Sequence, residues 1–327
     1  MSINSNTKIQ RDPLGIISKS GMCDALEEDS VQEFCLLLMA KFDGKFFAAG
    51  TSTVLGSGIW IGPEGPETIL VAVTARHCLS NLFKEFQVPE PRPLLPGLPI
   101  PTFRPPWTLC GGQITKDGMG LWSAMWQCSG YDDLALIYWR PVNEIARRTT
   151  FAQPVISYFS PEISTDLWGF GFGGCRTIMP PAEAPNCNFE SGRKLSKGQI
   201  VQYLDGTRQE RWVTDMPVMD GMSGGPVFWK DRLVGLFSSK LEGGAEHRSF
   251  VMRIQMIIHF ELDGAPILNG QKFAKVSDLA EHGIIATLPT CQKIDSVKAV
   301  PRYDLEVWTR QQCDTSALIS QRSQLPL

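Results

Sequence analysis

The octapeptide Asp220-Gly221-Met222-Ser223-Gly224-Gly225-Pro226-Val227 places a serine in a glycine-rich turn that leads into an apolar strand. A turn of this kind can expose the serine oxygen and leave backbone N–H groups free beside it. Acyl-transfer enzymes need both features, because the oxygen is the nucleophile and the N–H groups stabilise the oxyanion that forms. A glycine-rich turn can also be purely structural, so the assignment depends on partners for Ser223 elsewhere in the chain.

Two further segments supply such partners. Val73-Thr74-Ala75-Arg76-His77-Cys78 is an apolar strand that ends at a histidine, and Tyr131-Asp132-Asp133-Leu134-Ala135-Leu136 places aspartates before an apolar strand. A histidine, with an ordinary pKa of about 6.5, can take the serine proton near neutral pH. A carboxylate can hold the imidazole tautomer and stabilise its charged form. We expect Asp133 in this role because it directly precedes the strand; Asp132 is the competing candidate.

Together the three segments resemble the chymotrypsin- and trypsin-like serine peptidases. Thr74-Ala75-Arg76-His77-Cys78 is similar to the Thr-Ala-Ala-His-Cys of that family, and Gly221-Met222-Ser223-Gly224-Gly225-Pro226 to its Gly-Asp-Ser-Gly-Gly-Pro. Asp133-Leu134-Ala135-Leu136 is similar to the segment that carries the family's buried aspartate. The order His, Asp, Ser is also the family's order. The resemblance covers residues 31–262 and implies a serine endopeptidase that acts through an acyl-enzyme intermediate, with His77, Asp133 and Ser223 as the catalytic residues.

The resemblance also implies the fold. It predicts an all-β chain with two six-stranded antiparallel β-barrels of the chymotrypsin type, a short C-terminal helix and a C-terminal extension. Short apolar segments separated by Gly, Pro and Asp fit this class, and Asp43-Gly44 is typical of a hairpin turn. The expected divisions are an N-terminal arm at 1–30, a first barrel at 31–145, a second barrel at 146–262 and an extension at 263–327.

Three segments between and after the expected barrels have their own predictions. Residues 140–154 are polar and are interpreted as the linker between the barrels. Residues 88–107 hold eight prolines, which prevent regular sheet and favour an extended surface loop. Residues 254–262 and 274–282 are expected to form helices.

The resemblance assigns the oxyanion hole and the specificity pocket. The backbone N–H groups of Gly221 and Ser223 would form the hole. Pro217, six residues before the nucleophile, would lie at the base of the pocket, and Ser238, Ser239 and Lys240 would line it. Pro217 cannot pair with a cation and Lys240 would repel one, so cleavage after Arg or Lys should be poor. Small or apolar residues are expected there, with acidic residues as the alternative if Lys240 points inward.

Met222 departs from the family pattern. Secreted trypsin-like enzymes have an aspartate at this position, which pairs with a new N-terminus after zymogen cleavage. Here the position holds a methionine, and no Ile-Val-Gly-Gly occurs near the beginning of the chain. We therefore expect no activation by N-terminal processing, as in the intracellular and bacterial branch of the family.

Composition limits the other classes of function. A formal net charge of −3 without a long basic run predicts no nucleic-acid partner, and the lack of a long apolar run predicts no membrane span. Without a signal-peptide pattern, a cytoplasmic location is expected. The nine scattered cysteines include no Cys-x-x-Cys, so we expect no metal site; no cofactor is expected either. Cys78 has no partner in the strand that the family resemblance places opposite it, and it is predicted to be a free thiol.

The expected partner is a protein or peptide substrate. The proline-rich loop or the C-terminal extension could in addition bind a regulatory protein. The alternative hypothesis is a catalytically silent or partner-activated protease fold that acts as a protein-binding module.

Overall fold

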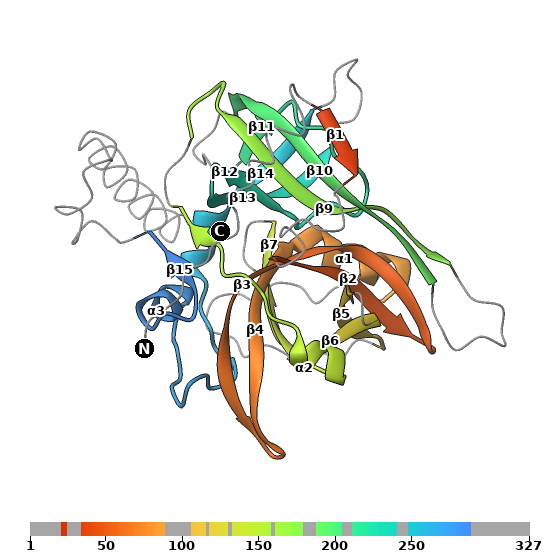
Figure 1. The fold of residues 1–327 in the computed structure, drawn as a ribbon, viewed down its shortest axis with the longest axis vertical. Coiled ribbons are helices and arrows are strands. Elements are labelled where there is room, and N and C mark those ends of the chain that lie inside the picture. The colour runs from red at the N-terminus through yellow and green to blue at the C-terminus, as the bar shows by residue number, and fades with distance from the viewer. Residues whose placement is uncertain are drawn as a thin grey trace, which may run out of the picture.

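The computed structural model describes residues 21–24, 34–88, 106–115, 118–129, 133–157, 161–178, 188–204, 211–240 and 248–288. The described chain is mostly β and forms two sheets, one above the other in Figure 1. Short loops connect the strands, and a few short helices accompany them along the chain.

The first sheet is a closed six-stranded antiparallel barrel. Its strands follow one another around the barrel in the order β2 (Cys35–Phe42), β3 (Lys45–Gly62), β4 (Gly65–Ala75), β7 (Leu134–Pro141), β6 (Gly118–Ser129) and β5 (Thr108–Thr115). The predicted turn joins β2 to β3, because Asp43 and Gly44 both adopt positive φ, 49° and 74°. Buried Val, Leu and Ile side chains fill the barrel from β2, β4 and β7.

The second sheet contains nine strands. They are β1 (Gly21–Asp24), β8 (Val155–Ile156), β9 (Asp166–Ile178), β10 (Asn188–Tyr203), β11 (Arg211–Thr214), β12 (Pro226–Trp229), β13 (Arg232–Lys240), β14 (Ser249–Arg253) and β15 (Ala286–Thr287). Strand β12 pairs with both β9 and β13, so β9, β10, β11, β14, β13 and β12 form a closed circuit of pairings. The expected all-β fold class is therefore confirmed.

Two features of the second sheet differ from the expectation of purely antiparallel barrels. Strand β8 pairs in parallel with β13 on one side and with β15 on the other. Strand β1 pairs with β10, so the expected N-terminal arm contributes a strand to this sheet. Both additions join segments far apart in sequence, which a local pattern cannot indicate.

Among the described residues, four short helices accompany the sheets. They are α1 (Arg76–Glu85), α2 (Glu144–Arg148), a 3-10 helix (Ile254–His259) and α3 (Val276–Glu281). The last two lie within the segments expected to be helical. Helix α2 lies in the expected linker, and α1, which was not predicted, follows β4 without a loop. None of the helices in the described ranges is long and apolar enough to cross a membrane.

The C-terminal extension is part of the core as far as it is described. Its buried apolar residues lie against the main hydrophobic cluster, and they are Leu268, Phe273, Val276, Leu279, Ile284 and Ile285. The sequence analysis placed residues 263–327 outside the two barrels and did not predict this packing. The prolines of the 88–107 segment lie outside the described residues, apart from Pro106.

Candidate active site

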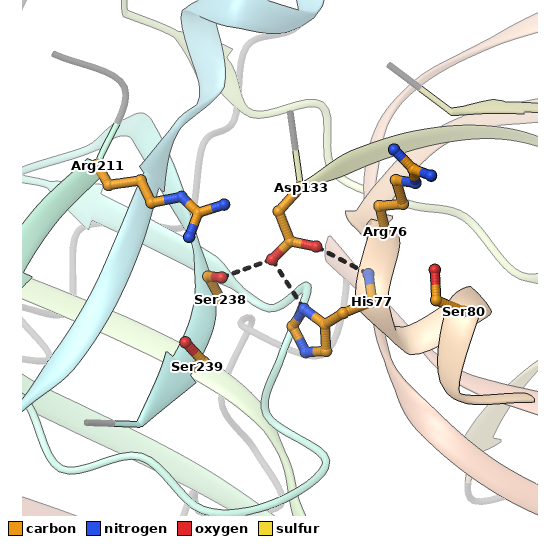
Figure 2. A pocket seen from close by; sticks show the side chains of 7 residues that line it. All are labelled: Arg76, His77, Ser80, Asp133, Arg211, Ser238 and Ser239. Atoms are coloured by element: carbon orange, nitrogen blue, oxygen red, sulfur yellow. Dashed lines mark hydrogen bonds and ion pairs between the residues drawn. The ribbon is translucent and has the colours of Figure 1, made fainter. Parts of the chain in front are cut away.

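His77 and Asp133 come together because their strands are neighbours. Strand β4 ends at Ala75 and β7 begins at Leu134, and these two residues are paired in the sheet. The residues just beyond that pair therefore meet: the Arg76 N–H donates to the Asp133 carbonyl (3.0 Å), and the His77 N–H donates to Asp133 Oδ1 (2.8 Å). His77 Nδ1 lies 2.8 Å from Asp133 Oδ2. The carboxylate thus fixes both the backbone and the ring of His77 (Figure 2).

Ser238 of β13 brings the second sheet to this pair. Its hydroxyl donates to Asp133 Oδ2 at 2.6 Å, the same oxygen that contacts the imidazole. Its backbone carbonyl accepts a hydrogen bond from Ser223 Oγ at 2.5 Å. Ser238 was expected to line the specificity pocket, whereas its side chain is turned to Asp133.

The contacts of the pair favour its ionised form. Burial alone lowers the pKa of the His77 imidazole, but the hydrogen bond to Asp133 and the contact with Cys78 outweigh it and raise the pKa above the usual 6.5. Burial alone raises the pKa of Asp133, but the hydrogen bonds from His77 and Ser238 and the charge of His77 lower it below 3.8. Each group therefore stabilises the charge on the other.

Ser223 lies in the loop between β11 and β12, in a tight backbone conformation. Gly221 and Gly224 on its two sides have φ of 94° and 85°, values that residues with a side chain rarely adopt. A Cβ at Gly224 would also lie 2.1 Å from the Thr51 carbonyl oxygen. The glycines of the motif are thus required by the shape of this loop.

The loop presents two unused backbone donors. Within the part of the chain that the structure describes, the N–H groups of Gly221 and Ser223 donate no hydrogen bond. The Asp220 carbonyl accepts from the Gly174 N–H at 2.9 Å. Because the peptide between Asp220 and Gly221 is trans, its N–H points away from Gly174. An oxyanion hole needs two such backbone donors.

Threonines of the first barrel hold this loop in place. The Thr51 N–H donates to the Ser223 carbonyl at 2.8 Å. The Thr51 hydroxyl oxygen, Oγ1, donates to the Gly221 carbonyl at 2.8 Å and accepts from the Phe172 N–H at 3.0 Å. Thr53 Oγ1 donates to the Gly224 carbonyl at 2.7 Å. These residues were not predicted, because the sequence Thr51-Ser52-Thr53 of a strand carries no sign of which segment packs against it.

Ser223 and His77 are close without a direct hydrogen bond. Ser223 Oγ is bonded to the Ser238 carbonyl, and among the described residues no bond joins it to His77. Cys78 Sγ contacts both residues, at 3.9 Å from His77 Nε2 and 3.6 Å from the Ser223 carbonyl oxygen. For Ser223 to donate to Nε2, its single hydroxyl hydrogen must leave the Ser238 carbonyl. Hydrogen bonds of this kind are often long or misaligned in free enzymes.

The expected specificity residues are only partly brought together. Ser239 lines a cavity beside His77, and the Pro217 carbonyl accepts a hydrogen bond from Ser196 Oγ at 2.7 Å. Lys240 pairs with Ser249 in the sheet, but its side chain lies outside the described set. Asp132 is also outside the described residues.

Met222 is fully buried in the apolar cluster of the second sheet. A Cβ at Gly171 would lie 2.7 Å from the Met222 Cα, and one at Gly173 would lie 3.3 Å from its Cγ. These two glycines of β9 therefore make room for the methionine. Met222 thus makes apolar contacts at the position where the family pattern has a charged aspartate.

A cavity of about 460 Å³ adjoins the His77–Asp133 pair. Figure 2 shows its lining side chains, which are Arg76, His77, Ser80, Asp133, Arg211, Ser238 and Ser239. No cluster of metal-ligating side chains occurs among the described residues. Of the described cysteines, Cys35, Cys78 and Cys110 are free thiols, as predicted for Cys78.

Comparison with known proteins gives distant structural likenesses alone. No family model matches the chain, and no curated protein matches it. Among solved structures, human heparin binding protein has 14% identity and a TM-score of 0.46, covering 73% of this chain and 92% of that one. The MamO protease domain from Magnetospirillum magneticum, in its apo form, has 12% identity and a TM-score of 0.42, covering 70% and 96%. At such TM-scores these likenesses carry no argument about the site.

Proposed function

We propose that the protein is a serine endopeptidase. The observation that carries the proposal is the meeting of two chemically complementary parts across the two sheets: an imidazole held by Asp133, and a serine loop with two free N–H donors. Neither part alone suggests peptide hydrolysis, but acyl transfer needs both.

In the proposed reaction Ser223 Oγ attacks the carbonyl carbon of the substrate peptide bond. His77 Nε2 takes the hydroxyl proton as the Oγ–C bond forms, and the carbonyl oxygen becomes an anion between the N–H groups of Gly221 and Ser223. The C–N bond then breaks as His77 gives the proton to the leaving amine. Water, with its proton taken by His77, hydrolyses the acyl-enzyme and restores the Ser223 hydroxyl.

Asp133 and Ser238 would act on His77. The Asp133 carboxylate holds Nδ1, so that Nε2 faces the reaction, and its charge stabilises the imidazolium that forms. The Ser238 hydroxyl occupies the remaining side of Oδ2 and fixes the carboxylate. A cleavage preference against Arg and Lys is part of the proposal, because Pro217 supplies no negative charge.

A second candidate is a silent or partner-activated protease fold that binds protein. One observation favours it: Ser223 Oγ is bonded to the Ser238 carbonyl and not to His77. In this candidate a partner would release the serine by moving β13. The proline-rich loop at 88–107 and the C-terminal extension at 263–327 remain candidate contact regions, and the cytoplasmic location remains a prediction.

Peptide hydrolysis by the purified full chain tests the proposal. A proteome-derived peptide library should be cleaved internally by the wild-type chain, and Ser223→Ala should abolish cleavage while leaving the thermal unfolding midpoint close to that of the wild type. Absence of cleavage by folded wild-type protein would favour the silent or partner-activated candidate. Equal cleavage by the Ser223→Ala chain would refute the assignment of the nucleophile.

A further inference from the structure

The cavity beside His77 contains a cation that the proposed mechanism does not use. Arg211 is the first residue of β11, is half-buried and lines the cavity. Its backbone carbonyl accepts from the Leu204 N–H, but its guanidinium forms no hydrogen bond or ion pair with another residue of the described ranges. In Figure 2 its guanidinium group extends toward the space beside Asp133 and Ser238.

Asp133 is not available as the partner of Arg211. Asp133 Oδ1 accepts from the His77 N–H, and Oδ2 accepts from both the His77 ring and the Ser238 hydroxyl. Its charge is already shared with the imidazole, whose raised pKa reflects that pairing. The positive charge of Arg211 therefore faces the cavity.

The other lining groups suit an anion. Arg76 lines the cavity on the opposite side of Asp133 in Figure 2, and Ser239 contributes a hydroxyl group. Arg211 thus shares the cavity with one carboxylate that is already engaged. A planar guanidinium binds a carboxylate through two parallel hydrogen bonds, which makes a carboxylate a fitting occupant.

The position of the cavity indicates which part of a substrate reaches it. Ser223 does not line the cavity, whereas His77 and Ser238, which contact the catalytic groups, do. The residue whose carbonyl carbon is attacked must reach Ser223 and hence lies outside this cavity. A side chain bound beside Arg211 belongs to a neighbouring residue of the same peptide.

We propose that Arg211 is a specificity-determining residue that binds an acidic side chain of the substrate next to, not at, the residue whose carbonyl is attacked. The inference rests on the proposed endopeptidase function and adds a substrate class to it. It does not depend on Lys240 of the expected pocket for the attacked residue, whereas Ser238 and Ser239, which were also expected in that pocket, line the cavity beside Arg211.

The test compares paired peptides that differ by one charge. A peptide cleaved by the full-length chain is resynthesised with Glu or Gln at each position near the cleaved bond, and kcat/KM is measured for each pair. At one position, Glu should be preferred over Gln by roughly tenfold or more, the size expected of a charge-assisted hydrogen bond. The preference should weaken at high salt, since part of it is electrostatic.

Variants connect the preference to Arg211. Arg211→Gln should reduce the Glu/Gln ratio to near one, and Arg211→Lys should keep part of it. Arg148→Gln is the matched control, because Arg148 lies on α2 with its side chain 82% exposed and does not line the cavity. A ratio near one at every position in the wild type, or a ratio that survives in Arg211→Gln, would overturn the proposal.

A binding measurement separates this inference from the proposed function. Fluorescein-labelled peptide pools with Glu or Gln fixed at one position are titrated with the Ser223→Ala chain, and polarisation is recorded. The acidic site is supported if a Glu pool binds the Ser223→Ala chain more tightly than the matching Gln pool and this difference disappears in the double variant with Ser223→Ala and Arg211→Gln. This result supports the site even if the wild type cleaves no peptide. If the wild type cleaves peptides but shows no difference between Glu and Gln in kinetics or in binding, the proposed endopeptidase function stands and the proposed role of Arg211 is wrong.

Discussion

At the scale of the residue, Asp133 has the largest number of roles. Its two oxygens accept from the His77 backbone, the His77 ring and the Ser238 hydroxyl. Its side chain is 13% exposed, so these bonds are partly shielded from water. A change of this one group should affect the tautomer, the orientation and the pKa of His77 together.

Asp133→Asn should lower kcat/KM by about 10⁴-fold, since an amide cannot stabilise the imidazolium and favours the wrong tautomer. The pH dependence should move as well. Catalysis needs neutral His77, and with Asp133 present its raised pKa places the rise of kcat/KM above pH 6.5. Removing the carboxylate takes away its hydrogen bond and its charge, and only the contact with Cys78 still opposes burial, so the pKa of His77 should fall and the rise should shift to lower pH. An unchanged pH midpoint in the variant would show that Asp133 does not set the pKa of His77.

Sequence reasoning proposed His77, Asp133 and Ser223 as the catalytic residues because each lies in a distinctive local motif. It did not find Thr51, and it assigned Ser238 to a pocket. Both act through single hydroxyl groups on ordinary strands, and their partners lie 170 and 105 positions away. Such contacts arise only from the way in which the two sheets pack.

At the scale of the element, strand β3 is the support for the serine loop. Through Thr51, strand β3 forms hydrogen bonds to the carbonyls of Gly221 and Ser223 and to the Phe172 N–H. Thr51→Val keeps the shape but removes the hydroxyl, so the part-buried Gly221 carbonyl and the buried Phe172 N–H lose their partner. The free energy of unfolding should fall by about 1–3 kcal/mol, and kcat should fall more than KM rises. Thr68→Val, at an exposed position of β4, is the control and should change neither.

The contact between β3 and α1 gives a second prediction. A Cβ at Gly50 would lie 2.7 Å from Cys78 Sγ and 3.0 Å from the Ser223 carbonyl oxygen. Gly50→Ala should therefore lower both activity and the thermal unfolding midpoint. Adding Cys78→Ala removes the sulfur and should restore part of each. If the double variant is as impaired as the sum of the single variants, the clash with Cys78 is not the cause.

The elements themselves were predicted unevenly. The Asp43-Gly44 hairpin and the helical segments after residue 254 follow from local sequence, and they are present. Helix α1 was not predicted, because the segment around His77 was interpreted only as the end of a strand. The short strands β8 and β15 hold two residues each, too few for any pattern of alternation.

At the scale of the whole molecule, the C-terminal segment ties the two sheets together. Ile285 forms a β-bridge with Gly56 of the first barrel. The Ile284 carbonyl accepts a hydrogen bond from the side chain of Gln153 in the linker. Strand β15, which follows directly, pairs with β8 of the second sheet. Ile284 and Ile285 are 2% and 1% exposed. The relative position of the sheets, and hence of His77 and Ser223, should depend on this segment.

Ile285→Ala should lower the free energy of unfolding by about 2–5 kcal/mol, because it leaves a cavity where three parts of the chain meet. Chemical denaturation measures this directly. Ile267→Ala is the matched control: Ile267 lies in the same extension but is 53% exposed, and its loss should change stability by less than about 0.5 kcal/mol. Equal effects of the two substitutions would mean that the segment does not contribute to the core.

The central claim is that Ser223 is a nucleophile activated within this pair of sheets. The most direct measurement is reaction of the intact chain with a fluorophosphonate probe, followed by peptide mapping of the adduct by mass spectrometry. The account predicts one adduct, on Ser223, without prior cleavage near the N-terminus, absent from Ser223→Ala and strongly reduced in His77→Ala. Folded protein that takes up no probe, or a Ser223→Ala chain that is labelled to the same extent, would contradict it.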